Sequence, residues 1–376
     1  MNKGSENIVY TEVEEEDNST IKEIKNPFNP KKIDIASKSL SVDLLIKRLN
    51  SNPPEIDLYP DFQRKGGIWS DTKQSRLIES LLIRLPLPAF YFDGSDDDKW
   101  LVVDGLQRLT TIKRFVIDKK LVLQNMEFLK VLNDKKFDQL PREFQRRIEE
   151  TQIIAYIIKP GTPSAVKFNI FQRINTGGEP LTAQEIRHAL NQGMPAKFVE
   201  KLSLLSSFKD ATDNIRPDRM LDRDFVTRFV SFYLISYTEY EPDLDSFLNK
   251  GMNKLKNLSE EELTVLRNDF NNSMDAAKEI FGKYAFRKRP SKESNIRRRP
   301  LSKALFDALS VALAKLNDEE RKTLITKKNK LEEKLIDLMN NNEEFHQAIS
   351  QATGARVKVI TRFKTIEDLI KKILSE

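Results

Sequence analysis

The chain has 376 residues, of which 39% are apolar and 32% charged, and its formal net charge is +6. This length is sufficient for a sizeable hydrophobic core, most simply in two domains. The absence of cysteine excludes disulfides, thiolate zinc sites and cysteine nucleophiles, and the two histidines, His188 and His346, are too few for most His-based metal sites.

Targeting signals are absent from the sequence as given. No stretch approaches the 18 or more uncharged apolar residues of a membrane span, and residues 1–20 lack the apolar core of a signal peptide. We therefore expect a cytoplasmic protein with no membrane partner.

Charge is unevenly distributed along the chain. Residues 1–20 carry six acidic residues and one lysine, a net of −5, and residues 1–26 are predicted to form an acidic disordered tail. Residues 282–303 carry nine basic residues and one glutamate, a net of +8. This basic segment is either a contact for the nucleic-acid backbone or a solvated basic loop. The DNA-contact hypothesis concerns Arg287, Lys288, Arg289, Arg297, Arg298 and Arg299.

The first half of the chain has the pattern of a mixed α+β domain. Apolar spacing predicts helices over 39–50, with Ser41 as N-cap, and over 70–86, where Pro86 ends the pattern. Short apolar runs predict strands near 55–58, 88–92, 99–103 and 151–159, the middle pair joined by a hairpin-like connection. A further helix is expected over 109–117.

The second half is predicted to be mostly helical. Val166, Ile170 and Ile174 indicate a helix, and Thr182 with Glu185 forms a capping box that begins the next one. From residue 196 onward the pattern is almost entirely helical. The expected domains are therefore 27–195, of α+β class, and 196–376, helical and containing the basic segment.

The stretch Asp104–Arg108 is the first candidate site. Its letters, DGLQR, lie between a predicted strand and a predicted helix. A glycine there allows backbone N–H groups to approach an anion at the helix N-terminus, and arginine binds phosphate with two hydrogen bonds. Asp104 is a candidate ligand for Mg²⁺ or water, and Thr110 or Thr111 would add a hydroxyl group. The alternative is an ordinary turn in which Asp104 caps the helix and Arg108 pairs with a carboxylate. The chain has no Walker A sequence.

Four motifs, read in order, carry a family resemblance. They cover residues 59–92, 102–115, 168–190 and 219–229. Together they resemble the N-terminal domain of GmrSD-type restriction endonucleases, over a span from about Asn26 to about Ala285. The resemblance implies a ParB/sulfiredoxin-like fold in which a loop such as DGLQR binds nucleotide phosphates, in a component of a restriction or anti-phage defence system that hydrolyses nucleoside triphosphates.

The resemblance also implies roles for individual residues. Asp104, Gln107 and Arg108 would be catalytic, and Glu185 and Arg187 would support the site. The nucleotide-binding residues would be Gln63, Arg64, Gly105, Thr110, Thr111, Arg173 and Asn175.

Two departures from the family pattern shape the functional hypotheses. The first departure is Leu106, which stands where the family signature has its first glutamine; this substitution affects hydrolysis more than binding. The second is that the C-terminal half has no HNH-like spacing around His346. The first hypothesis is a nucleotide-binding NTPase, with Mg²⁺ and DNA as partners, that acts without its own nuclease domain. The second is a non-enzymatic DNA-binding or sensing module that recruits a separate nuclease. The third is a nuclease that uses carboxylates such as Asp104 and a divalent metal. Oligomer formation is left open.

Overall fold

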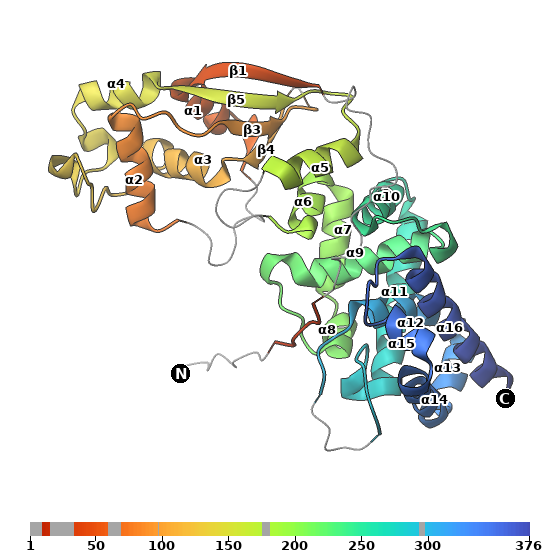
Figure 1. Ribbon diagram of the computed structural model, residues 1–376. Coiled ribbons are helices and arrows are strands. Elements are labelled where there is room, and N and C mark those ends of the chain that lie inside the picture. Colours follow the sequence, from red (N-terminus) through yellow and green to blue (C-terminus); the bar gives the residue numbers. More distant parts are fainter. Residues whose placement is uncertain (1–9, 16–33, 59–68, 97, 175–180, 293–297) are drawn as a thin grey trace. The chain divides into compact units, whose positions relative to one another are not determined.

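The computed structural model describes residues 10–15, 34–58, 69–96, 98–174, 181–292 and 298–376 (Figure 1). Contacts between residues divide the chain into two units. The sheet unit is Phe28–Leu190, and the helical unit is Asn191–Glu376 together with Met1–Pro27. Each unit has its own hydrophobic core.

The sheet unit is built on a mixed five-stranded sheet of order β1-β5-β3-β4-β2. Strands β1 with β5 and β3 with β4 pair antiparallel, whereas β3 with β5 and β2 with β4 pair parallel. The strands are β1 (Ile35–Ser41), β2 (Ile56–Asp57), β3 (Phe90–Asp93), β4 (Trp100–Asp104) and β5 (Gln152–Ile158).

Helices cover both faces of this sheet, because side chains alternate between the faces along each strand. Phe90, Phe92 and Trp100 pack in one core cluster, whereas Val103 and Ile158 belong to another. The first cluster includes residues of α1 (Val42–Asn50), α2 (Asp71–Leu82), α3 (Leu106–Ile112) and α4 (Arg142–Glu150). The second includes residues of α5 (Ser164–Ile174) and α6 (Ala183–Leu190).

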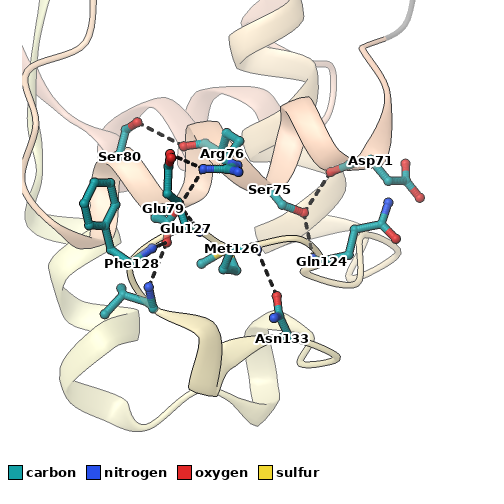
Figure 2. A network of polar contacts seen from close by, with 11 residues as sticks. Asp71, Ser75, Arg76, Glu79, Ser80, Gln124, Met126, Glu127, Phe128 and Asn133 are labelled. Carbon is teal, nitrogen blue, oxygen red and sulfur yellow. Dashed lines mark hydrogen bonds and ion pairs between the residues drawn. The ribbon is translucent and has the colours of Figure 1, made fainter.

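A buried carboxylate on α2 holds the loop that follows α3 (Figure 2). The side chain of Glu79 accepts hydrogen bonds from the backbone N–H groups of Glu127, Phe128 and Leu129, at 2.7–2.9 Å. Burial raises the pKa of Glu79, but the three backbone donors and Arg76 outweigh this effect, so the pKa lies below its ordinary value. The loop is therefore fixed to the helix by its backbone.

The same loop is closed at its ends. Leu123 donates its N–H to the carbonyl of Lys135 at 3.0 Å, and Asp134 donates its own to the carbonyl of Leu123 at 2.7 Å. On the α2 side, Ser75 accepts a hydrogen bond from the N–H of Gln124 at 3.0 Å. We call the residues Leu123–Lys135 the pinned loop.

The helical unit surrounds a central helix, α12 (Lys303–Ala314), in which all residues from Ala304 to Ala314 are buried. Asp307 on this helix binds Arg228 of α9 (Leu221–Leu234) through both carboxylate oxygens, at 2.7 and 2.8 Å, and Arg362 of α16 (Arg356–Ser375) at 3.1 Å. The other helices of the unit are α7 (Met194–Ser203), α8 (Ser206–Thr212), α9 (Leu221–Leu234), α10 (Leu244–Lys256), α11 (Glu260–Phe281), α13 (Asp318–Thr326), α14 (Lys328–Asn341), α15 (Glu343–Ala348) and α16 (Arg356–Ser375).

The α+β class predicted from the sequence is confirmed, as are most of its local features. Ser41 caps α1 by accepting the N–H of Leu44 at 3.2 Å, and Glu185 accepts the N–H of Thr182 at 2.7 Å in the predicted capping box. Strand β1 was not predicted. The prediction of disorder for residues 1–26 is wrong for Tyr10–Glu15, since Thr11 and Val13 form β-bridges with Ile215 and Leu301.

The buried Asp307 cluster generates a stability prediction. Replacing Asp307 by Asn leaves two buried guanidinium groups without a carboxylate, and is expected to lower the free energy of unfolding by about 3–5 kcal/mol, measured by urea denaturation. Glu333→Gln, which removes an exposed carboxylate paired with Lys292 in the same unit, is the control and is expected to leave the midpoint nearly unchanged. Equal midpoints for both variants would contradict the prediction.

Candidate functional site at the junction of β4 and α3

The junction between β4 and α3 requires glycine at position 105. Gly105 is the N-cap residue of α3 and has φ +99°, in the left-handed region. A Cβ atom added there would lie 2.5 Å from Cδ1 of Phe90, closer than real Cβ atoms come to another atom. Backbone conformation and the contact with Phe90 therefore both exclude a larger residue.

Arg108 joins three parts of the sheet unit. Its guanidinium group donates to Oδ2 of Asp104 at 2.8 Å, to the carbonyl of Ala89 at 3.3 Å and to the carbonyl of Pro88. It also lies 4.4 Å from the centre of the Phe90 ring, and only 8% of the residue is exposed. The alternative in which Arg108 pairs with a carboxylate is thus the arrangement found, although Gly105 rather than Asp104 is the N-cap.

Burial and pairing act in opposite directions on Arg108. Burial lowers the pKa of its guanidinium group, and the neighbouring Asp104 carboxylate raises it. Arginine nevertheless stays protonated at neutral pH. The junction therefore contains a fixed positive charge whose hydrogen-bonding fork is occupied by protein groups.

The first turns of α3 bind the segment that leads into α2. Gln107 accepts the backbone N–H of Trp69 through Oε1 at 3.3 Å, and the hydroxyl of Thr111 donates to the carbonyl of Gln107 at 2.8 Å. Gln74 of α2 donates to the carbonyl of Trp69 at 2.5 Å. Thr110 is half-buried and makes no hydrogen bond to the described residues through its side chain.

Five residues of this region were missed by the sequence analysis. Arg114, in the π-helical turn Lys113–Ile117 that follows α3, pairs with Asp71 and donates to Oε1 of Gln74 at 3.1 Å, so side chains bind the first turn of α2 to this turn. The Lys73 ammonium group lies 4.6 Å from the centre of the Trp69 ring. The only sequence signal was Ser70, which caps α2, because it places the residues that follow it in the first turn of a helix.

The remaining predicted site residues lie on α5, on α6 or outside the described residues. Arg173 is exposed in the last turn of α5 and makes no hydrogen bond or ion pair with the described part of the chain. Arg187 is buried on α6, where it donates to Oε1 of Gln184 at 2.7 Å. Gln63, Arg64 and Asn175 lie outside the described residues.

A metal ligand set at the junction would depend on Asp104. Mg²⁺ is usually bound by one or two carboxylates together with phosphates and water. Asp104 is engaged by Arg108 through Oδ2, and its Oδ1 makes no hydrogen bond to the described residues. Among these residues no group of three or more His, Asp or Glu side chains is arranged to hold a metal. Asp104 fits Mg²⁺ only as a single ligand that a bound triphosphate would complete.

The basic segment of the helical unit is largely paired within that unit. Arg287 is buried and donates to the carbonyl of Arg299 at 2.7 Å and to the hydroxyl of Thr11 at 2.9 Å. Burial, together with the nearby charge of Arg298, lowers the pKa of Arg287 to about 10. Arg287 is therefore tied to the N-terminal residues as well as to its own segment.

Three further cations of the predicted DNA contact have acidic partners. Lys288 binds Glu14 at 2.6 Å, and Arg298 binds Asp213 at 2.5 Å. Arg289 pairs with Glu332 and lies over the Tyr284 ring. Arg299 is exposed and makes no ion pair with the described residues, and Arg297 lies outside them. The DNA contact stays a prediction. The net charge of this segment is larger than the number of cations that are available to bind a ligand.

One family model matches the chain. The model described as GmrSD restriction endonuclease, N-terminal domain, matches residues 42–191, which are most of the sheet unit. These residues form a domain of the GmrSD N-terminal domain family. No curated protein matches the chain. Within the described residues, no helix has the length and apolar character needed to cross a membrane.

The position of Arg108 generates a prediction that separates structure from ligand binding. Replacing Arg108 by Ala is expected to lower the free energy of unfolding by about 3 kcal/mol, because Asp104 and two carbonyl groups lose their donor. The measurement is urea denaturation without nucleotide. Arg146→Gln, at an exposed arginine that also follows a glutamine, is the control. Unchanged stability of the Arg108 variant would contradict the prediction and show that folding does not depend on the fork.

Proposed function

We propose that this chain is a nucleotide-binding component of a DNA restriction or anti-phage defence system, acting in the cytoplasm. The observation that carries the proposal is that the matched domain contains the Asp104–Arg108 junction. A left-handed glycine there precedes a helix N-terminus, where backbone N–H groups favour an anion. We also propose the ParB-like fold for the sheet unit, supported by its mixed sheet with helices on both faces.

The proposal gives the junction residues distinct roles. Because its guanidinium group is already hydrogen-bonded to protein groups, Arg108 is a positioning residue. It orients Asp104 and supplies positive charge beside the phosphates. The backbone at Gly105 and the hydroxyl of Thr110 contact the triphosphate, and Arg173 neutralises it from α5. Asp104 Oδ1 binds the Mg²⁺ ion that accompanies the nucleotide. Leu106 is expected to impair nucleotide hydrolysis more than nucleotide binding, since it cannot orient a water molecule as glutamine does.

A second candidate function is a non-enzymatic DNA-binding module that recruits a separate nuclease. The observation that favours it is the occupied fork of Arg108, which leaves the junction with few free polar groups for chemistry. A nucleoside triphosphate that binds without being hydrolysed, in the presence and absence of DNA, would support this function over the first.

Nucleotide binding is tested at Arg173, which is exposed and makes no hydrogen bond or ion pair with the described part of the chain. Arg173→Gln is expected to weaken binding of a nucleoside triphosphate roughly tenfold, since one charge-assisted hydrogen bond contributes about 1.5–3 kcal/mol. Isothermal titration across the four nucleotides measures the change, and phosphate release with and without DNA measures hydrolysis. Arg146→Gln removes another exposed charge, on α4, and is expected to bind as the wild type does. If no nucleotide binds the wild-type protein, the proposal fails.

The nuclease hypothesis has a direct test. Plasmid DNA incubated with the purified chain and Mg²⁺, Mn²⁺ or Zn²⁺ is expected to stay intact, because the chain has only two histidines and His188 is buried. Gel electrophoresis after incubation with and without nucleotide gives the readout. Linear product that Asp104→Asn abolishes would replace the proposal by a carboxylate-dependent nuclease.

A further inference from the structure

The pinned loop exposes apolar side chains although its backbone is firmly held. Phe128 is 70% exposed and Val131 is 76% exposed, whereas Leu123, Met126 and Leu132 of the same loop are buried. Single exposed apolar residues are ordinary on protein surfaces. Here two of them lie three residues apart. The packing of the loop does not require either, because the loop already has a buried apolar face.

The backbone of this loop is already ordered before any ligand binds. The three hydrogen bonds to Glu79 fix the residues on either side of Phe128, and Met126 donates its N–H to Oδ1 of Asn133 at 3.0 Å. In Figure 2 the Phe128 ring lies apart from the side chains that make these contacts. Preorganisation of this kind lowers the entropy cost of binding.

Lysines without ion pairs flank the exposed side chains in the sequence. Residues 119–136 contain five lysines and two acidic residues, a net of +3, and one of the lysines, Lys119, is paired with Asp138. One of the two acidic residues, Glu127, is paired with Arg76. Within the described part of the chain no ion pair involves Lys120, Lys130, Lys135 or Lys136. This differs from the basic segment of the helical unit, where most cations have acidic partners.

We propose that the pinned loop and its flanking lysines are a binding surface for duplex DNA. The lysines contact phosphates, and Phe128 with Val131 forms an apolar wedge at a base step in the minor groove, as apolar side chains do in many minor-groove proteins. Charge complementarity selects a polyanion as the occupant. The inference rests on the proposed function, because a DNA restriction or defence role identifies the polyanion as DNA. It assigns the DNA contact to the sheet unit.

The experiment measures binding of the full chain to a fluorescein-labelled duplex by anisotropy across a salt series. Lys130→Gln with Lys136→Gln is expected to flatten the slope of log affinity against log salt by about 2, since each phosphate contact contributes roughly 0.9. Phe128→Ala is expected to weaken binding roughly tenfold at an unchanged slope, and Phe128→Trp to retain it. Melting temperatures of all variants should match the wild type.

Matched controls come from the helical unit. Val265 and Val357 are exposed to a similar extent, at 54% and 71%, and their double replacement by Ala should not change binding. Lys256→Gln with Lys322→Gln removes the same net charge from exposed positions. A loss of affinity in these controls equal to that in the loop variants would overturn the proposal.

Other outcomes also decide between the proposals. Wild-type affinity in the loop variants overturns the loop proposal and leaves nucleotide binding, read by titration, intact. If the wild-type chain binds no duplex, the loop proposal fails even where nucleotide binds. Phe128-dependent binding to vesicles of anionic phospholipid, with none to DNA, would replace the proposal by a membrane-surface contact.

Discussion

The hydrogen-bonded pair of Asp104 and Arg108 determines how the candidate site is built. Arg108 binds the end of β4 through Asp104, the entrance to β3 through the carbonyls of Pro88 and Ala89, and the ring of Phe90. Phe90 in turn leaves no room for a side chain at Gly105. The Asp, Gly and Arg of the DGLQR motif therefore all have roles in folding. Any ligand must be bound mainly by the backbone and by side chains outside this pair.

The same use of charge recurs in the helical unit. Asp307 binds two buried arginines, and Glu14 and Asp213 bind cations of the basic segment. Buried pairs of this kind contribute little net stability, but removing one partner is costly because the other charge stays buried. Counting charged residues along the sequence thus gives a poor measure of binding capacity. The pinned loop is distinguished by lysines that lack such partners.

Local signals in the sequence predicted the parts of the fold that depend on neighbouring residues. The capping box at Thr182 and the N-cap at Ser41 satisfy backbone donors within one turn, so the sequence alone specifies them. Strand β1 depends on pairing with β5, in which Ser41 meets Gln152, more than 100 residues away. The bridge between Val13 and Leu301 is still more distant. The acidic composition of the tail gave no sign of that backbone pairing.

The sequence identified the residues of the candidate site but did not predict their contacts. The sequence placed Asp104, Gly105 and Arg108 between a strand and a helix. In the structure Asp104 ends β4, Gly105 caps α3 and Arg108 already lies within that helix. It could not show that Arg108 would reach the carbonyls of residues 88 and 89, because nothing in a sequence records which backbone groups need a donor. Trp69, which Gln107 binds, was missed for the same reason.

Helix α2 connects the two sites proposed for the sheet unit. Its first turn binds the π-helical turn after α3 through Asp71 and Arg114, and Glu79 in its third turn holds the pinned loop. A nucleotide that changed the position of α2 would therefore change the loop as well. Such coupling is reciprocal, so a nucleotide that raised the affinity for DNA by some factor would itself bind more tightly, by the same factor, when DNA is present. Titrating nucleotide with and without duplex measures this factor, and a factor of one would mean that α2 transmits nothing between the sites.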